Sequence, residues 1–390
     1  MVVINVKINS MAGSDYENGF VRINDGIFTE IGDMTDFAPQ EEEVFDGKGS
    51  EMYPGFIDAH CHLGMFGDGL TFEGDDGNET TDPSTPHLRA IDSINAMDRC
   101  FEDAFKGGIT AVCTGVGSAN PIGGDFALIK TYGSKQVDRL IVKAPAAIKF
   151  ALGENPKSTY NDRDETPVTR MGSVGIIREQ LHKAVRYKEE LDEYLAAKGT
   201  EDETSRPDYD AKCEALLPLL EHKCKAHFHC HRADDIFTAI RIAKEFSLDY
   251  VLIHCTDGAL IAGELAEENA CAVLGPLMGD RGKPELRNHS IETPAALFSQ
   301  KVPFAICTDH PETPIQYLPL TAALAVRGGL SREEALKGIT VNAAKILGVS
   351  DRLGTIAIGK DADFSLWYAD PLDITAKPAA VCVNGQFTDL

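Results

Sequence analysis

Metal-binding and acid–base side chains recur in this chain at or near the ends of short apolar segments. The set comprises His60, His62, Lys149, His227, His229, His231, His254 and Asp309. Imidazole and carboxylate groups are the ligands that Zn²⁺ and similar divalent cations prefer in proteins. A lone histidine is usually a hydrogen-bonded structural residue, but recurrence at several segment ends predicts a metal centre.

The spacing of these residues separates the histidines from the cysteines beside them. Alternate residues of a β-strand lie on the same face of a sheet. His60 and His62 in GFIDAHCH are therefore expected to point together, whereas Cys61 faces the other side. The same alternation separates the later histidines from the cysteines that follow them. Cys307 shares the face of Asp309 and is expected one layer deeper, in the core.

The segments that carry these side chains are predicted to be strands separated by helices. The strand-like runs are GFIDAHCH, ITAVCTGV, LIVKAPAAIKFAL, AHFHCH, YVLIHC, ACAVLG and FAICTD, with ALIKTYG as a possible further strand. Helical patterns lie near residues 88–106, 171–198, 208–224, 234–246, 258–269, 293–300, 316–328 and 331–347. Such alternation predicts a parallel α/β sheet, and roughly eight units close a barrel with its active site at the carboxyl ends of the strands.

The two ends of the chain have a different character from the middle. Residues 1–50 show alternating strands with a turn at Asn24-Asp25-Gly26, and residues 351–390 show strands with a turn at Asn384-Gly385. We therefore expect the terminal segments to pair into a small β-sandwich. The predicted division is a β-sandwich from residues 1–50 and 351–390 beside a barrel from residues 51–350.

The acidic composition and the scattered cysteines restrict the partners and the compartment. With a formal net charge of −24, the surface repels nucleic acid and anionic membranes, so neither is an expected partner. The ten cysteines lack CxxC spacing, which favours reduced thiols in a cytoplasmic protein. The first residues do not resemble a signal peptide, and no apolar run is long enough to span a membrane.

Several motifs, taken together and in order, resemble a known family. PGFIDAHCH, HCHRADD, VLIHCTDG, CTDHP and LGTIAIGKDADFSLW look like the amidohydrolase superfamily of metal-dependent hydrolases. GENPK, TRMGSVGIIRE and TDHPETPIQY resemble its imidazolonepropionase-related members. The resemblance covers nearly the whole chain. It implies a distorted (β/α)₈ TIM barrel, one or two divalent metal ions, a small-molecule substrate and, by family habit, a homo-oligomer.

The resemblance also assigns roles to individual residues. His60 and His62 match the metal-binding pair of the first barrel strand. His229 and His254 match the ligands of the fifth and sixth strands. Asp309 matches the last-strand aspartate, which binds metal and takes a proton from the attacking water.

The other two histidines beside His229 are assigned by their depth. His231 is expected nearer the barrel mouth, where it could touch substrate. His227 is expected deeper, as a packed structural residue.

Two further residues of this region leave alternatives open. Lys149 in PAAIKFAL resembles a strand lysine that is carboxylated and bridges two metals, although it could instead face the helices and extend to solvent. Glu154 in GENPK could supply the bridging carboxylate in its place. Glu154 could also contact substrate or serve only as a turn residue.

The expected activity is hydrolysis of a C–N bond by a metal-activated water, with Asp309 and His254 as catalytic residues. The substrate is a cyclic amide, a dipeptide or an N-acyl amino acid. Zinc is the first expectation for the metal, with manganese, iron or cobalt also suited. The alternative is a deaminase with one metal on the same scaffold, and a non-catalytic barrel homologue is a third hypothesis. No GxSxG elbow and no P-loop occur in the sequence.

Overall fold

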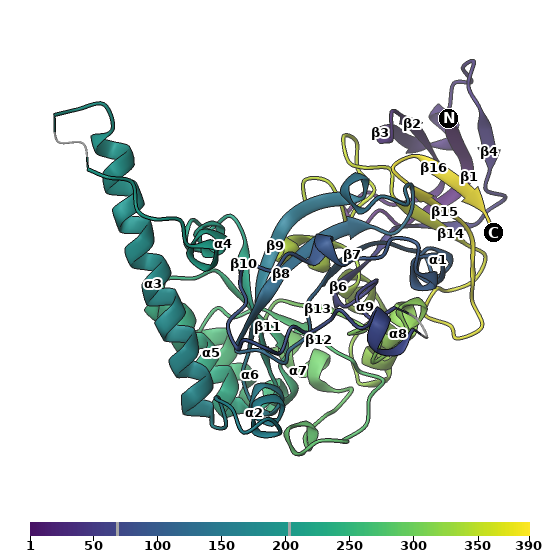
Figure 1. Cartoon of the computed structure of the whole chain (residues 1–390). Helices are drawn as coiled ribbons and strands as arrows, with labels where there is room; N and C mark the ends of the chain where they lie inside the picture. The colour runs from purple at the N-terminus through teal and green to yellow at the C-terminus, as the bar shows by residue number, and fades with distance from the viewer. Residues whose placement is uncertain (68–69, 202–203) are drawn as a thin grey trace.

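The computed structural model describes residues 1–67, 70–201 and 204–390, which form two β-sheets with helices around one of them (Figure 1). The strands of the first sheet are β6 (Phe56–Cys61), β7 (Ile109–Gly115), β8 (Ile122–Lys130), β9 (Ile141–Ala151), β10 (Lys225–Cys230), β11 (Tyr250–His254), β12 (Ala272–Leu274) and β13 (Phe304–Ile306). They lie side by side in chain order from β6 to β13. The apolar runs predicted to be strands form this sheet, and so does the possible strand ALIKTYG.

One strand of this sheet runs against the others. β6 and β7 are parallel, and so are the neighbours from β9 to β13, but β8 is antiparallel to both β7 and β9. The parallel direction expected for this strand is therefore wrong. The connections on either side of β8, residues 116–121 and 131–140, are too short for the helical crossover that parallel strands need. The chain turns back on itself instead.

The two edges of the sheet meet and close a barrel. The segment after β13 is hydrogen-bonded to β6 and its continuation. The N–H of Asp309 donates to the carbonyl of His60 at 3.2 Å, and the N–H of His62 donates to the carbonyl of His310 at 2.8 Å. Closure therefore brings the HCH motif beside the predicted catalytic aspartate.

The barrel interior is filled by strand side chains. Ala59, Phe126 and Val251 come from strands on different sides of the barrel and belong to one buried apolar cluster. Ala226 and Phe228 of β10 belong instead to the larger cluster that contains the helix side chains. Because the residues that alternate with them in β10 are histidines, β10 presents imidazoles to the interior.

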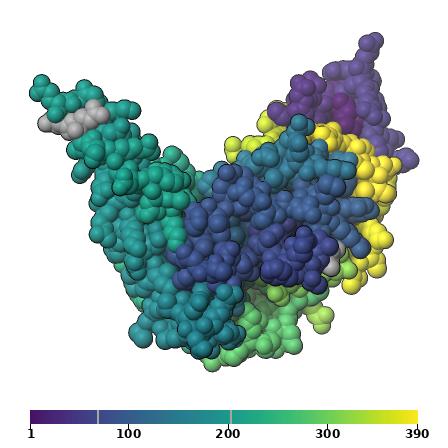
Figure 2. Space-filling view, viewed as in Figure 1, coloured from purple at the N-terminus to yellow at the C-terminus, as the bar shows by residue number. Residues whose placement is uncertain are grey.

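The helices surround the barrel, mostly on its outer side (Figure 1). They are α1 (Arg99–Lys106), α2 (Glu154–Asn161), α3 (Arg170–Ala197), α4 (Ala211–Leu220), α5 (Ala233–Glu245), α6 (Ala262–Glu267), α7 (Thr293–Ser299), α8 (Leu318–Arg327), α9 (Arg332–Gly338) and α10 (Val341–Leu347). Capping side chains fix several starts: the hydroxyl of Thr169, for example, accepts from the N–H of Gly172 at the start of α3. Figure 2 shows the far end of α3 projecting from the body on the side opposite the first strands of the chain.

Most predicted helices are present, with three differences. α1 begins at Arg99 rather than near residue 88. The helix predicted over 331–347 is divided between α9 and α10. α2 was not predicted, because glycine and proline in GENPK favour a turn, whereas a proline in the first turn of a helix is tolerated.

The second sheet joins the two ends of the chain. Its strands are β1 (Val2–Ile8), β2 (Tyr16–Asn24), β3 (Ile27–Asp33), β4 (Val44–Asp46), β5 (Glu51–Pro54), β14 (Phe364–Trp367), β15 (Pro378–Val383) and β16 (Gln386–Asp389). β5 and β14 pair antiparallel, which confirms the predicted association of the terminal segments. Val3, Phe28 and Phe364 belong to a buried core of this sheet. The domain boundaries at residues 50 and 351 stay a prediction.

Both predicted hairpin turns of this sheet are confirmed. Asp25 and Gly26 between β2 and β3 have φ angles of 49° and 78°. Asn384 and Gly385 between β15 and β16 have φ angles of 48° and 74°. Two successive left-handed residues match the twist of the flanking strands, which is why Asp-Gly and Asn-Gly are favoured there.

The cysteines lie where the strand alternation predicted. Cys61 belongs to the large apolar cluster that includes the helices, and Cys307 belongs to the barrel interior. All the cysteines are free thiols, and most are buried. Among the described residues, no helix has the length and apolar character needed to cross a membrane.

Candidate active site

A cavity of about 380 Å³ lies at the carboxyl ends of the barrel strands. The sequence-predicted residues that line it are His62, His229, His231, His254 and Asp309. His60 and Lys149 lie beneath them, fully buried. The structure thus brings most of the predicted site residues into one space.

Five of these residues form a mixed cluster, so named because imidazole, carboxylate and amine groups meet in it (His60, His62, Lys149, His254 and Asp309). The Oδ1 atom of Asp309 lies 3.8 Å from Nε2 of His60 and 3.3 Å from Nε2 of His62. The Nζ atom of Lys149 lies 2.9 Å from Nε2 of His60. His60, His254 and Asp309 present ligand atoms that all lie within 4.8 Å of one another.

Backbone carbonyls fix the tautomers of two of these histidines. Nδ1 of His62 lies 2.7 Å from the carbonyl oxygen of Gly115, and Nδ1 of His254 lies 2.6 Å from that of Gly275. Because a carbonyl only accepts, each Nδ1 carries the proton and each Nε2 keeps its lone pair. A Cβ on Gly275 would lie 2.2 Å from the carbonyl oxygen of Cys307, so only glycine can place its carbonyl against His254.

His254 enters the cavity through a backbone turn rather than through strand alternation. Val251 and Ile253 belong to the interior cluster, so regular alternation would direct the next side chain to the other face. The φ angles of 71° at His254 and 47° at Cys255 change that direction. Left-handed non-glycine residues carry strain of order 1–3 kcal/mol and cluster at functional sites.

Lys149 faces the other predicted ligands and not the helices. It is fully buried in β9, and its hydrogen-bond partner is the imidazole of His60. The ring of Phe126 lies 5.3 Å from Nζ. Burial lowers the pKa of Lys149 to about 8, although the charge of Asp309 works in the opposite direction. A buried amine in this environment loses its proton more readily than an exposed lysine.

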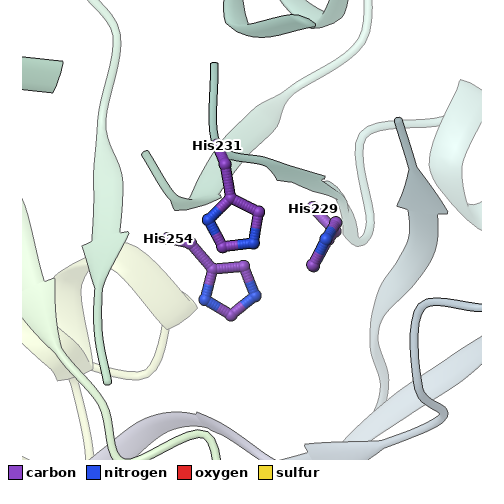
Figure 3. A group of neighbouring side chains, drawn as sticks. All are labelled: His229, His231 and His254. Carbon is purple, nitrogen blue, oxygen red and sulfur yellow. The ribbon is translucent and has the colours of Figure 1, made fainter. Parts of the chain in front are cut away.

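A second group, the imidazole triangle, is formed by His229, His231 and His254 (Figure 3). The centroids of the three rings are separated by 4.7 Å, 4.6 Å and 4.7 Å. Nδ1 of His231 lies 2.7 Å from the hydroxyl of Thr256. His254 belongs to both groups and connects them.

Burial keeps these histidines neutral near pH 7. It lowers the pKa of His254 to about 4, with Asp309 opposing the shift, and it holds the pKa values of His60, His229 and His231 well below the usual range. Burial alone would raise the pKa of Asp309, but the neighbouring histidines and Lys149 outweigh it and lower that pKa. Neutral imidazoles beside a carboxylate are the protonation states that metal binding requires.

The residues present fit a divalent cation. Nδ1 of His60, Nδ1 of His229 and Oδ1 of Asp309 are buried without a hydrogen-bond partner among the described residues. Buried polar atoms are normally paired, so the unpaired Oδ1 of Asp309, which faces Nε2 of His60 and Nε2 of His62, indicates a place for a ligand.

Asp58 is a site-supporting residue that the sequence-based prediction omitted. Its carboxylate accepts hydrogen bonds from the N–H of His60 and the N–H of Thr308, each at 3.1 Å, and from the Thr308 hydroxyl. It therefore ties β6 to the residue before Asp309. Burial raises the pKa of Asp58 to about 7, although these hydrogen bonds oppose the shift. The available signal was an aspartate inside the apolar run GFIDA.

Residues beyond the strand ends complete the cavity wall. Nδ2 of Asn155, in the first turn of α2, donates to the hydroxyl of Ser118 at 2.7 Å and lies 3.4 Å from Nε2 of His229. Its Oδ1 accepts from Nζ of Lys283 at 2.7 Å. Asn155 and Lys283 were not predicted, because neither residue lies at the end of an apolar segment.

Glu154 and His227 lie outside the cavity wall. Glu154 begins α2, where its N–H donates to Oε2 of Glu285, and its neighbour Asn155 is the residue that lines the cavity. The structure therefore does not bring Glu154 to the predicted ligands. His227 pairs with Lys149 in the β9–β10 register, one layer below His229, and is buried as expected for a structural residue.

Comparison with known proteins supports these observations. Residues 52–388 match the sequence profile of the Amidohydrolase family. The crystal structure of an amidohydrolase from Thermotoga maritima MSB8 has a TM-score of 0.93 and 39% identity, covering 99% of this chain and 98% of that one. An imidazolonepropionase of Sphingopyxis alaskensis is 26% identical over 396 residues, covering 96% of this chain and 93% of that protein. An amidohydrolase, tasK, of Hapsidospora irregularis is 28% identical over 95% of this chain, which spans 40% of its length.

The chain belongs to the amidohydrolase family. Its relatives place it with the imidazolonepropionase-related members, as the sequence motifs indicated. The family confirms the distorted barrel with a small β unit and makes the protein a hydrolase of C–N bonds that acts on small molecules.

Proposed function

We propose that this chain hydrolyses a C–N bond of a cyclic amide, a dipeptide or an N-acyl amino acid with the help of one or two divalent metal ions. The observation that carries the proposal is the convergence of His60, His254 and Asp309, whose ligand atoms lie within 4.8 Å of one another. Zinc suits imidazole and carboxylate ligands best, and manganese, iron or cobalt would also fit. Similarity to an imidazolonepropionase supports a substrate of that kind.

We assign two roles to the predicted site residues: some would bind the metal, and one would transfer a proton. His60, His62 and Asp309 would hold one ion, and His229 with His254 would hold another. A bound divalent ion lowers the pKa of water toward about 7 and so supplies a nucleophile near neutral pH.

Asp309 is the residue suited to move the proton. Its Oδ1, buried without a partner, would accept the proton of the attacking water and return it to the leaving nitrogen. No other carboxylate belongs to either ligand group among the described residues.

His254 is better suited to bind metal than to polarise the substrate carbonyl. The sequence suggested both roles. Because the proton of His254 lies on Nδ1 and is donated to Gly275, its Nε2 has no proton to donate to a carbonyl. We therefore keep the ligand role and leave polarisation of the carbonyl to the metal.

We further propose that Lys149 is carboxylated and bridges two ions. The neutral amine would attack carbon dioxide, form an N–C bond and lose a proton, which gives an anionic carbamate. The burial of Lys149 and its lowered pKa support this step, since both favour the neutral amine. Glu154, the alternative bridge, is not among the described residues that line the cavity.

The competing activity is a deaminase with one metal. Such an enzyme would attack an amidine carbon and release ammonia, and it would leave Lys149 without a bridging role. A non-catalytic homologue is a weaker proposal, because the predicted ligands converge at a cavity.

Metal analysis of the purified full-length chain, combined with a hydrolysis screen, tests these proposals. The screen includes cyclic amides, dipeptides, N-acyl amino acids and amidines. We expect bound metal and turnover of one amide class, lost on chelation and restored by Zn²⁺. A single ion with ammonia release from amidines alone would support the deaminase. Full metal loading without turnover of any compound would contradict an enzymatic role.

Two further properties rest on the sequence. We propose a cytoplasmic location from the reduced, scattered cysteines. We propose a homo-oligomer from family habit. Size-exclusion chromatography with light scattering would test the second proposal directly.

A further inference from the structure

The imidazole triangle contains one histidine more than the family motifs assign to metal. Those motifs use His229 and His254, and they leave His231 to the substrate. We propose that His231 is itself a metal ligand, so that three imidazoles hold the second ion. This inference rests on the metal dependence proposed above, but it does not depend on which substrate is hydrolysed.

The centroids of the three rings are separated by nearly equal distances. Their centroids lie 4.7 Å, 4.6 Å and 4.7 Å apart, and the ligand atoms of all three lie within 4.8 Å of one another. The rings of His231 and His254 are stacked with an interplanar angle of 8°, and His229 is turned by 83° and 78° to them. Figure 3 shows the rings on different sides of one space. No ring is set back as a more distant substrate contact would be.

The hydrogen bonding of His231 leaves a ring nitrogen free for a cation. The hydroxyl of Thr256 can accept the proton of Nδ1 at 2.7 Å, which leaves Nε2 with its lone pair. The carboxylate oxygen Oε1 of Glu285 lies 3.7 Å from this Nε2, beyond hydrogen-bond distance, and 3.6 Å from Nζ of Lys283. A proton on Nε2 would be expected to draw that oxygen closer. His62 and His254 have the same tautomer.

The burial of His231 matches that of the two motif-assigned ligands. His231 is 5% exposed, compared with 3% for His229 and 5% for His254. Ligand atoms of three neutral imidazoles lie close together in this buried space, and burying polar atoms without a partner is costly. A divalent ion would satisfy all three.

The proposed ligand count also agrees with the chemistry of catalytic metal sites. Such zinc sites commonly use three protein ligands and keep one position open for water or substrate. With His231 included, each position has three histidine or aspartate ligands besides the proposed carbamate of Lys149: His60, His62 and Asp309 for one, and the imidazole triangle for the other.

Metal titration of the full-length chain tests this proposal without an activity assay. The apo protein is titrated with Co²⁺, the absorption of bound Co²⁺ is recorded, and bound metal is counted after gel filtration. The test variant is His231→Gln. The matched control is His289→Gln, because His289 lines the same cavity but donates from Nε2 to the carbonyl of Pro276 and belongs to neither ligand group.

We expect His231→Gln to weaken the binding of one ion by about 100-fold or more, beyond the roughly 10–100-fold typical of a group that only orients a ligand. The other ion and the His289→Gln control should be unaffected. Thr256→Val, which removes only the orienting hydroxyl, should cause a smaller loss. Circular dichroism of each apo variant shows whether the fold is retained.

Three results would count against the proposal in distinguishable ways. If folded His231→Gln binds as many ions as the unmodified chain with equal affinity, His231 is not a ligand. If that variant also raises KM and leaves kcat unchanged, the substrate role suggested by the sequence is correct. If the unmodified chain binds no ion, the proposed metal-dependent hydrolase fails and this inference fails with it.

Discussion

The mixed cluster and the imidazole triangle share His254 but differ in charge. The mixed cluster holds the carboxylate of Asp309 and the amine of Lys149. The carboxylate can accept a proton, and it can balance the positive charge of a bound ion. The triangle consists of imidazoles whose pKa values burial lowers, so it offers neutral ligands only. Proton transfer is therefore expected in the mixed cluster, whereas the imidazole triangle can contribute only ligands.

The two groups are also held in place differently. In the mixed cluster, backbone hydrogen bonds between β6 and the segment after β13, together with the Asp58 carboxylate, fix His60 relative to Asp309. In the triangle, His229 and His231 depend on side chains from loops and helix starts, namely Asn155 and Thr256. Substitutions in the strands should therefore damage the mixed cluster first, and substitutions in the loops should damage the triangle first.

The largest effect is expected from Asp309→Asn. This change removes the only carboxylate of the two ligand groups among the described residues, and with it both a ligand and the proton acceptor. We expect kcat/KM to fall by about 1,000-fold or more in steady-state assays. Glu312→Gln is the matched control, because Glu312 also lines the cavity and belongs to neither group. Activity of Asp309→Asn within tenfold of the unmodified chain would remove proton transfer from this residue.

The next largest effect is the loss of metal from His60→Ala, which distinguishes His60 from the neighbouring Cys61. His60→Ala should abolish binding of the ion held by the mixed cluster, because it removes a buried ligand. Cys61→Ala should retain the metal and cost about 1 kcal/mol of folding stability, since Cys61 packs in the outer apolar cluster. Metal analysis and thermal unfolding of both variants provide the measurement. Loss of metal from a folded Cys61→Ala protein would overturn the assignment.

A smaller effect is expected from Lys149→Met. Loss of the proposed bridge should reduce the bound metal from two ions to one and lower hydrolysis roughly 100-fold. In the metal-free, uncarboxylated protein, folding stability should not fall, because an apolar side chain of similar length replaces a buried amine whose hydrogen-bond partner is an imidazole rather than a carboxylate. Native mass spectrometry of the unmodified chain should show the carbamate, and unchanged metal content in the variant would contradict the bridge.

A second buried lysine provides the control for that stability effect. Lys130 is ion-paired to Asp361 at 3.0 Å and to Asp363 at 2.7 Å. Lys130→Met should therefore destabilise the fold by about 3–5 kcal/mol, because it leaves the buried carboxylate of Asp363 without its cation. Denaturant unfolding should show a lower free energy of unfolding for Lys130→Met and no decrease for Lys149→Met. Equal destabilisation would mean that Lys149 is also held by an anion.

The smallest effect is expected from Asn155→Ala, which acts on the triangle alone. Asn155 links His229 to Lys283, so its loss should weaken the ion held by the triangle by about tenfold and leave the other ion unchanged. Ser158→Ala is the control, since Ser158 lines the same cavity and belongs to neither ligand group among the described residues. Equal weakening of both ions by Asn155→Ala would break the distinction between the two groups.

The sequence predicted the fold well wherever hydrophobic pattern alone decides structure. The apolar runs form the barrel strands, and the two hairpin turns have the left-handed residues that their sequences require. The direction of β8 was not predictable from its own apolar pattern, because direction is set by the short connections on either side. α2 was missed because the proline of GENPK marks both loops and first helical turns.

The site was predictable where ligands follow strands, and not where they are supported from elsewhere. Alternation correctly paired His60 with His62 and separated Cys61 from them. For His254 the expected orientation is observed, but it results from left-handed backbone at residues 254–255 that no pattern revealed. Asn155 and Lys283 come from segments whose position depends on the closed barrel, so their convergence required the structure.

The central claim, metal-dependent C–N hydrolysis, is tested most directly by a metal-restoration experiment. The full-length chain is stripped with a chelator and assayed on the best substrate from the screen while Zn²⁺ is added back and bound metal is counted. We expect no hydrolysis without metal, and a rate of hydrolysis that rises with each bound ion until the site is filled. Full hydrolysis by the metal-free chain, or none by the fully loaded chain, would contradict the central claim.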